Sequence, residues 1–419
     1  PERFMPGIIP CMKPFPINGF SGINNRAPTD RLPKDESGRS AVADAVNVDL
    51  TEAGTFQRRP GAQRVVAGSN TRSLTSSGGY GYYAAGDTLF RFDGDVSSSA
   101  VATLASPYAN VCYAETSNGL AWSDGYTMNL IRNGATSRLA PSVPNPAPVA
   151  IGQAGGALRA GMYAVCFATV APGGQRSALT DPYFVDVPEN GRIRLSMAAL
   201  AATVDVFVTA PDGDIFYRDR TLPIGTTLQD LSVITSSGEP VVHEVTASLP
   251  PADILAYHNG RLLSVQGQFI RYSMPYNLGL YKPGSGYIPV PDVVTLVAAV
   301  EGGVYVATAS KTWFLSGKDV SKANMDEVAP YGATPGTLAA IPNSREVTWF
   351  SPRGPVRASI DGSITLLQDR QIAFSKADSG ASIYRETNGL RTLITALSGS
   401  SPGSGTAAFG CYMTARSVT

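Results

Sequence analysis

The residue types that most often perform catalysis or bind metals are sparse in this chain and far apart. The sequence has four cysteines and two histidines: Cys11, Cys112, Cys166, Cys411, His243 and His258. A structural zinc site needs paired thiolate or imidazole ligands at short spacing, and no C-x-x-C pair is present. The sequence therefore predicts buried free thiols and no metal site.

Motifs for other kinds of chemistry are equally weak. Neither histidine lies in a recognisable nucleophile motif, and the chain has no P-loop and no dinucleotide-binding fingerprint. A glycosidase needs two carboxylates that face each other across roughly 5 to 10 Å, whereas Glu115, Asp124, Glu301 and Glu327 are isolated in sequence. These observations predict that the chain is not an enzyme and uses no cofactor.

The composition indicates which types of secondary structure the chain can form, and any functional site must be built on them. The 43 Gly and 31 Pro make 74 of 419 residues, about 18%, against a usual share of about 12%, which argues against long helices.

Lys plus Arg and Asp plus Glu are 33 each, so the chain lacks the basic excess that drives binding to nucleic acid. No stretch approaches the roughly 18 apolar residues of a membrane span. We expect a soluble protein made in the cytoplasm.

Residues 1–40 differ from the rest of the chain. They are rich in Pro, Gly, Asn and Arg and show neither the helical nor the strand period. Such a segment buries too little of itself to offset its ordering entropy. The sequence predicts an extended N-terminal arm that is poorly ordered in a free monomer.

The main body is predicted to be a β-propeller. From residue 41 onward, short apolar runs alternate with turn signals, among them the Asp-Gly pairs that begin at Asp93, Asp124 and Asp212. Units of about 40 residues recur at least six times in residues 41–147 and 250–419, as the blades of a propeller do. We therefore expect an all-β, six- or seven-bladed β-propeller. A row of separate sandwiches is the alternative.

A second domain interrupts the propeller pattern. A Pro-rich link covers residues 141–148, and a second link lies near Leu249, Pro250 and Pro251. Between them, in residues 148–249, several short strands within about 90 residues fit a small sandwich. The sequence predicts an inserted fibronectin type III-like β-sandwich that divides the propeller into two parts.

The arm and the first strands carry a recognisable order of short motifs. The same order continues in the second propeller part. The motifs are Gly22-Ile23-Asn24-Asn25-Arg26, Arg31-Leu32-Pro33, Ala45-Val46-Asn47-Val48-Asp49, Arg58-Arg59-Pro60-Gly61, Leu255-Ala256-Tyr257-His258-Asn259-Gly260, Tyr331-Gly332-Ala333-Thr334-Pro335-Gly336 and Tyr384-Arg385-Glu386-Thr387-Asn388-Gly389. From about residue 18 to the end, the chain resembles the tail hub, nozzle and stabilisation proteins of bacteriophages.

The resemblance implies a structural protein of the virion tail, made in the host cytoplasm. It implies a homo-oligomer, a hexameric ring around the DNA exit channel, that docks the portal or adaptor and the tail fibres or spikes. DNA would pass through without specific binding. The assembly interface that we expect contains Asn24, Asn25, Arg26, Arg31, Arg58 and Arg59, of which the two adjacent arginines could also face solvent or a carboxylate.

Other functions stay open at this point. The chain is compact for a nozzle, so a distal tail, baseplate or receptor-binding component of a long-tailed phage is the main alternative. A carbohydrate-active propeller enzyme is the less favoured one.

Overall fold

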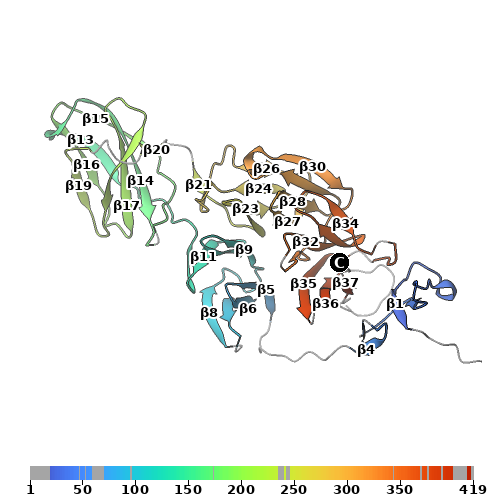
Figure 1. Ribbon diagram of the computed structural model, residues 1–419. Helices are drawn as coiled ribbons and strands as arrows, with labels where there is room; N and C mark the ends of the chain where they lie inside the picture. The colour runs from blue at the N-terminus through green and yellow to red at the C-terminus, as the bar shows by residue number, and fades with distance from the viewer. Residues whose placement is uncertain are drawn as a thin grey trace, which may run out of the picture.

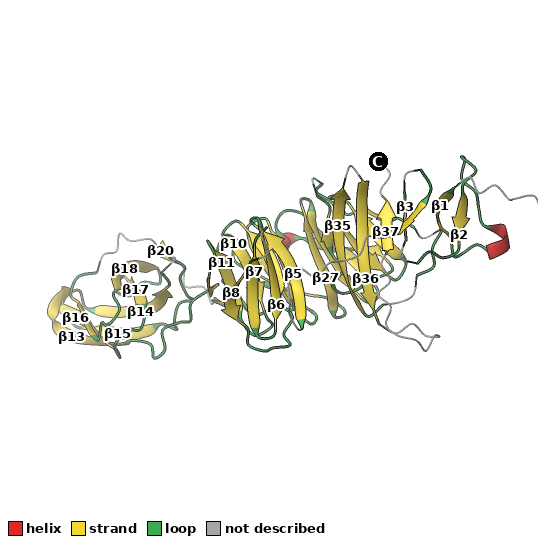
Figure 2. Cartoon of the chain, turned by 90° about the horizontal axis from the view of Figure 1, so that it is seen from below, coloured by secondary structure: helices red, strands yellow, loops and turns green. Residues whose placement is uncertain are grey.

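The computed structural model describes residues 19–416, except 47, 52, 59–69, 95–96, 173, 235–239, 242–245, 343, 369, 375–376, 388–389 and 400–412. These residues form β-strands and two short 3₁₀ turns, η1 (Thr29–Arg31) and η2 (Val320–Lys322) (Figure 2). In this part of the chain no helix has the length and apolar character needed to cross a membrane. The predicted all-β class is confirmed.

Six antiparallel sheets follow one another along the described chain and form the main body (Figure 1). The first sheet contains β5 (Thr71–Ser77), β6 (Tyr80–Ala85), β7 (Thr88–Phe92) and β8 (Ser98–Thr103), and the second contains β9 (Cys112–Thr116), β10 (Gly119–Ser123), β11 (Met128–Arg132) and β12 (Ala135–Arg138). The third contains β22 (Ile254–His258), β23 (Arg261–Gln266), β24 (Phe269–Tyr272) and β26 (Tyr287–Pro289), and the fourth contains β27 (Val294–Val300), β28 (Gly303–Thr308), β29 (Thr312–Ser316) and β30 (Asn324–Ala329). The fifth contains β31 (Ala339–Ala340), β32 (Val347–Ser351), β33 (Gly354–Ala358) and β34 (Ile364–Leu366), and the sixth contains β35 (Ser379–Thr387), β36 (Leu390–Ser398) and β37 (Met413–Arg416).

Tight turns between neighbouring strands set the register of these sheets. Asn133 and Gly134 have φ of 51° and 79°, and they join β11 to β12. Asn259 and Gly260, with φ of 44° and 81°, join β22 to β23 in the same way. Two consecutive positive φ angles define the hairpin turn that Asn-Gly favours, because its twist matches that of the strands. The chain also reverses direction after each of the three predicted Asp-Gly turns.

Hydrophobic clusters lie between consecutive sheets. Trp122 is 1% exposed in the cluster between the first and second sheets, and Trp349 is fully buried between the fourth and fifth, with its ring centroid 5.5 Å from that of Tyr305. Burying a side chain of this size contributes about 1.5 to 3 kcal/mol. A four-stranded sheet gains this only against a neighbouring sheet, which explains the propeller class. The predicted number of blades stays a prediction.

An inserted unit lies between the second and third sheets in the chain. One sheet has the order β13 (Val149–Leu158), β16 (Gly191–Ser196), β19 (Leu228–Leu231), and the other has the order β15 (Tyr183–Val187), β14 (Gly161–Val170), β17 (Thr203–Thr209), β18 (Phe216–Leu222), β20 (Pro240–Val241). Both sheets contribute to one core, in which Phe167, Ile193 and Val206 are fully buried. The unit stands apart from the six sheets (Figure 1). After the inserted unit, the chain re-enters the main body with β21 (Ala247–Ser248), which pairs with β25 (Leu280–Tyr281). The fibronectin type III likeness stays a prediction.

The described part of the N-terminal segment is folded. Strand β1 (Phe20–Ile23) pairs in parallel with β2 (Ser40–Val42), and β3 (Val48–Leu50) pairs with β4 (Phe56–Arg58). The rings of Phe20 and Phe56 are stacked 4.3 Å apart, which joins the two pairs of strands. This differs from the expected poorly ordered arm, because the aromatic stack supplies burial that strand periodicity did not reveal. Residues 1–18 lie outside the described residues, and the first four-stranded sheet begins at Thr71.

Candidate functional site

The two asparagines of the predicted interface contact their own chain. The Asn24 side-chain oxygen accepts hydrogen bonds from the backbone N–H groups of Arg26 (3.1 Å) and Ala27 (3.0 Å), which is an Asx turn. The Asn25 amide group donates to the Ala373 carbonyl (3.1 Å) and accepts from the Ala373 N–H (2.6 Å). The Asn25 backbone N–H also donates to the Gln371 carbonyl (3.2 Å). Asn25 therefore fixes the N-terminal segment to the chain just before β35.

The arginines of the predicted interface point to solvent where the structure describes them. Arg26, Arg31 and Arg58 are exposed. The Arg31 guanidinium lies 3.8 Å from the carboxylate of Asp30, and both side chains are mostly exposed, so this pair contributes little to stability. Arg59 lies outside the described residues. A role for these arginines between subunits stays a prediction.

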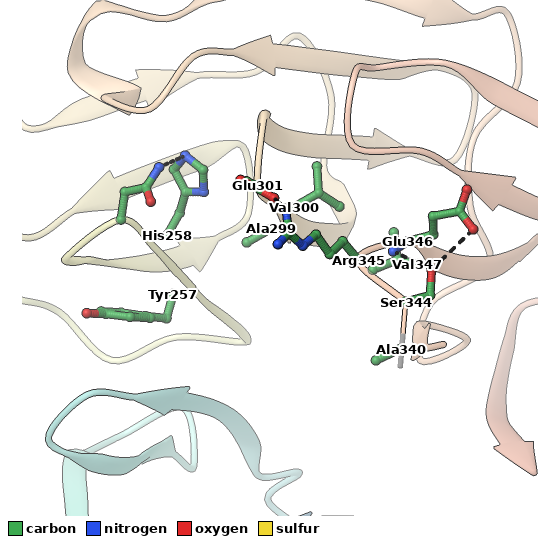
Figure 3. Close-up of a pocket in the computed structure, with 11 residues that line it drawn as sticks. Tyr257, His258, Ala299, Val300, Glu301, Ala340, Ser344, Arg345, Glu346 and Val347 are labelled. Carbon is green, nitrogen blue, oxygen red and sulfur yellow. Dashed lines mark hydrogen bonds and ion pairs between the residues drawn. The ribbon is translucent and has the colours of Figure 1, made fainter. Parts of the chain in front are cut away.

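An open recess of about 440 Å³ lies beside the third, fourth and fifth sheets (Figure 3). Its walls come from the β22–β23 turn, from the end of β27 and from the β31–β32 loop, which belong to the third, fourth and fifth sheets. The Tyr257 hydroxyl lies 3.2 Å from that of Ser117, in the β9–β10 turn, and links the second sheet to the third beside the recess. Corresponding turns of successive sheets thus supply the lining residues.

His258 is the only histidine among the residues that line this recess, and it is 4% exposed. Burial lowers the pKa of His258 below its ordinary value, although hydrogen bonds to the backbone of Gly317 and Val300 act in the opposite direction. The ring is therefore neutral near pH 7. Its Nε2 lies 3.1 Å from the Gly317 carbonyl oxygen and 3.0 Å from the Asn259 amide nitrogen. His258 fixes the β22–β23 turn to the end of β29.

The charged groups of the recess are already paired. Arg345 forms an ion pair with Glu301, and the Arg357 guanidinium binds Glu346 with its nearest nitrogen at 2.6 Å. Arg357 is the main reason why the pKa of the half-buried Glu346 is lowered despite its partial burial. Among the described residues, no group of three or more His, Cys, Asp and Glu side chains is placed to hold a metal ion. The recess offers polar contacts, among them the Ser344 hydroxyl, which donates a hydrogen bond to the Glu346 carboxylate at 3.3 Å.

Asp124 organises the turn after β10. Its carboxylate is 3% exposed and accepts hydrogen bonds from the backbone N–H groups of Ala105 (2.8 Å), Tyr126 (3.1 Å) and Thr127 (2.7 Å). Burial alone would raise the pKa of Asp124, but these hydrogen bonds outweigh it and lower the pKa. The sequence predicted an ordinary hairpin here. The contact with Ala105, which follows the first sheet, is what that prediction missed.

A second buried carboxylate lies in the inserted unit. Asp205 on β17 is 1% exposed, and its two oxygens accept from the Arg218 guanidinium at 3.0 Å each. The Arg176 guanidinium lies 2.9 Å away, and the Thr221 hydroxyl donates at 2.5 Å. Hydrogen bonds from Arg218 and Thr221 overcome the effect of burial and lower the pKa of Asp205. The sequence contains a signal for this buried charge, because Asp205 is the single charged residue in the otherwise apolar stretch 204–208 of β17.

Two of the cysteine predictions can be compared with the structure. Cys166 is a buried free thiol, as predicted, and Cys112 is a free thiol that is half-buried. Burial raises the pKa of each thiol to about 12, which makes both poor nucleophiles at neutral pH. Cys11 and Cys411 lie outside the described residues.

Comparisons with known proteins give a likeness of fold alone. No family model matches the chain, and no curated protein matches it in sequence. Virginiamycin B lyase from Staphylococcus aureus is similar in structure over 78% of this chain and 91% of its own, with 10% identity and a TM-score of 0.33. A structure of BBS1N in complex with ARL6DN is similar over 80% of this chain and 91% of its own, with 10% identity and a TM-score of 0.30. The likeness to bacteriophage tail proteins stays a prediction.

One prediction needs correction. The sequence predicted that the chain is not an enzyme, but virginiamycin B lyase is an enzyme, and one of its similar structures is a catalytically inactive variant. Membership of this fold class therefore gives no ground for excluding catalysis, and the prediction is withdrawn. The similarity supports no activity in this chain either. The chain also carries G-x-S-x-G at residues 399–403, of which Gly399 alone lies among the described residues.

Proposed function

We propose that this protein is a structural component of a bacteriophage tail, a nozzle or hub subunit. Copies of the chain would form a hexameric ring around the DNA exit channel, joined to the portal or adaptor on one side and to fibres or spikes on the other. The virion tail would be its final location. The proposal starts from the ordered motifs between residues 18 and 389 and is supported by the arrangement of the parts.

The observation that carries the proposal is the placement of the two parts outside the main body. The inserted unit lies at one end of the molecule and the N-terminal segment at the other, with the six sheets between them (Figure 2). A subunit of a ring needs a rigid body and separate surfaces for different neighbours. Two projecting parts at opposite ends would provide such surfaces without disturbing the core of the main body.

Charge also supports the proposal. The net charge of zero avoids the strong, salt-dependent phosphate binding that a basic lining would cause. DNA has to slide through a tail, so weak binding to the channel wall would suit the role. The exposed Arg26, Arg31 and Arg58 then remain as local groups for directed contacts with carboxylates of a neighbour.

The test is to find where the protein lies in the particle. Antibody fragments raised against the purified full chain would be bound to virions of the phage that encodes it and imaged by electron microscopy. We expect label on the tail axis, and closed rings when the purified protein is imaged at high concentration. Label at the tips of peripheral fibres would instead support the receptor-binding alternative. Absence of label from the virion would contradict the proposal.

A further inference from the structure

The three-stranded sheet of the inserted unit has one face in the core and one face toward solvent. Ile193 and Leu231 are fully buried in the core, so the residues that alternate with them lie on the opposite face. This sheet lies on the side of the unit away from the six sheets (Figure 1, Figure 2), and the opposite face therefore points away from the main body. We call it the distal face, and it is defined by Val149, Ile151, Arg192, Arg194, Leu228 and Asp230.

Aliphatic side chains lie on both outer strands of the distal face. Val149 on β13 and Leu228 on β19 are each paired with Ser196 of the central strand β16, so they flank it on either side. Ile151 lies one row along β13, opposite Arg194. Val149, Ile151 and Leu228 are 46%, 50% and 54% exposed. Neighbouring apolar side chains that stay half in water on a flat sheet are typical of a surface that a partner covers.

Two arginines and one carboxylate lie beside these aliphatic side chains. Arg194 donates to both oxygens of Asp230, from its Nε at 2.7 Å and from its Nη2 at 2.8 Å. These hydrogen bonds lower the pKa of Asp230, so the carboxylate is ionised at neutral pH. Arg192 has longer contacts, 3.3 Å to Asp230 and 3.4 Å to Gln153, and its Nε has no hydrogen-bond partner in the described part of the chain. The distal face therefore carries one positive charge in excess, at Arg192.

The chemistry of the distal face decides which partner fits it. A second copy of the same face would bring two like excess charges together, which opposes pairing. Nucleic acid binding needs several cationic groups along the phosphates, whereas this face has a single excess charge. A protein surface with one carboxylate among aliphatic side chains matches both features of the face. Arginine makes directed, paired hydrogen bonds with a carboxylate, and the aliphatic groups of the two surfaces would leave water together.

We propose that the distal face of the inserted unit binds a fibre or spike protein of the tail, with a carboxylate of that protein on Arg192 and its aliphatic side chains on Val149, Ile151 and Leu228. An arginine surrounded by apolar groups that exclude water is the usual arrangement of a binding hot spot. The inference rests on the proposed function, because it names the surface and the chemistry by which the subunit holds its outer partner.

The first experiment identifies what lies against the distal face in the assembled tail. Virions would be grown with the full chain carrying the photoreactive amino acid benzoylphenylalanine in place of Ile151 or Leu228, then irradiated, and the cross-linked peptides would be identified by mass spectrometry. We expect both positions to react with the same fibre or spike protein, at a segment that contains Asp or Glu. Phe184 is the control position, because it is 72% exposed and its neighbour Val185 belongs to the core, which places Phe184 on the outer face of the other sheet. It should not react with that protein.

The other outcomes separate this inference from the proposed function. Virions that contain the chain but give no cross-link to another protein from either position would overturn the inference and leave the tail function standing. Cross-links between two copies of the chain would show that the distal face pairs with itself, which also overturns it. Virions that lack the chain would overturn the proposed function, and the inference with it.

The second experiment tests the charge of Arg192. Arg192→Glu should lower the yield of the cross-link from position 228 by about tenfold or more, and Arg192→Gln, which adds no new charge, should lower it as well. Replacing the acidic residue of the partner's cross-linked segment by Arg should restore the yield in the Arg192→Glu chain, which a merely misfolded unit would not allow. Arg159→Glu, at an exposed arginine in the β13–β14 turn, is the matched control and should leave the yield unchanged. An unchanged yield for Arg192→Glu would contradict a carboxylate contact at Arg192 and overturn the proposal.

Discussion

Asp205 illustrates how a buried charge is held in this protein. Two arginines and a threonine hydroxyl surround a carboxylate that is 1% exposed, while the arginines themselves reach partly into solvent. The desolvation cost of the carboxylate is therefore offset by several charge-assisted hydrogen bonds. Removing the carboxylate leaves the guanidinium groups without their main partner.

We expect Asp205→Ala to lower the free energy of unfolding of the inserted unit by about 3 kcal/mol. Urea denaturation followed by circular dichroism would measure the change. Asp230→Ala is the matched control, because Asp230 also binds two arginines, Arg192 and Arg194, but its side chain is 28% exposed. The control should lose less stability. Equal losses for the two variants would show that burial of Asp205 does not set the cost.

Asp124 leads to a prediction about pH. The pKa of Asp124 in the folded state lies below the ordinary value. At a pH above the unfolded-state pKa of about 4, the ionised carboxylate therefore stabilises the fold. This contribution is lost as the pH falls through the folded-state pKa. Asp124→Asn should cost about 1.5 to 3 kcal/mol at pH 7, and the difference from the unchanged chain should shrink below about pH 4. Urea midpoints at pH 7 and pH 3 would measure it.

The exposed Asp292→Asn serves as the control for this comparison. Its carboxylate accepts a hydrogen bond from Val293 at the surface, and its substitution should change the urea midpoint little at either pH. A cost for Asp124→Asn that is as large at pH 3 as at pH 7 would contradict an electrostatic role for Asp124 and indicate a steric one.

At the scale of the elements, glycines decide where strands can approach each other. Gly119 begins β10 with φ of 134°, and a Cβ there would lie 2.3 Å from the Ile131 carbonyl oxygen on β11. The backbone cannot give way easily, because Ile131 is paired with Leu120 within the sheet. Gly267, with φ of 59° in the β23–β24 turn, has no atom within 4 Å of the corresponding position.

These two glycines separate a steric clash from backbone strain. Gly267→Ala should cost about 1 to 2 kcal/mol, the strain of a side chain at positive φ, whereas Gly119→Ala should cost clearly more because the clash adds to the strain. Thermal unfolding of the two variants would measure both. Equal losses would show that β10 shifts freely to accommodate the new methyl group.

At the scale of the whole molecule, the inserted unit has a core of its own. The residues of its two buried clusters all lie between Leu158 and Leu231, and none of them belongs to the clusters between the six sheets. Two cores without shared members should unfold separately.

We therefore expect that replacing residues 150–246 by a short Gly-Ser linker leaves the six sheets folded. The circular dichroism of the shortened chain should stay typical of β-structure, and one of two thermal transitions should disappear. The isolated residues 148–249 should show the missing transition. A shortened chain that does not fold at all would show that the inserted unit is needed for the main body to form.

The difference between what could and could not be predicted follows the range of the interactions. Strand alternation and turn residues act over a few positions, so the sequence alone indicated the all-β propeller class and the reversals at Asp93, Asp124 and Asp212. The folded state of the N-terminal segment depends on Phe20 and Phe56 meeting across 36 positions, and no local period records that contact. The buried role of Asp124 was missed for the same reason.

The amino-acid sequence by itself determined the class of elements, because Gly, Pro, Asn and alternating apolar residues restrict each short segment to strands and tight turns. The tertiary structure alone decided which groups meet. Asn25 binds Ala373 across 348 positions, and Asp205 gathers Arg176 and Arg218 from two other parts of the inserted unit. The physical reason is that a pattern of apolar and polar residues shows which side chains avoid water, while the surfaces that cover them depend on the packing of the whole chain.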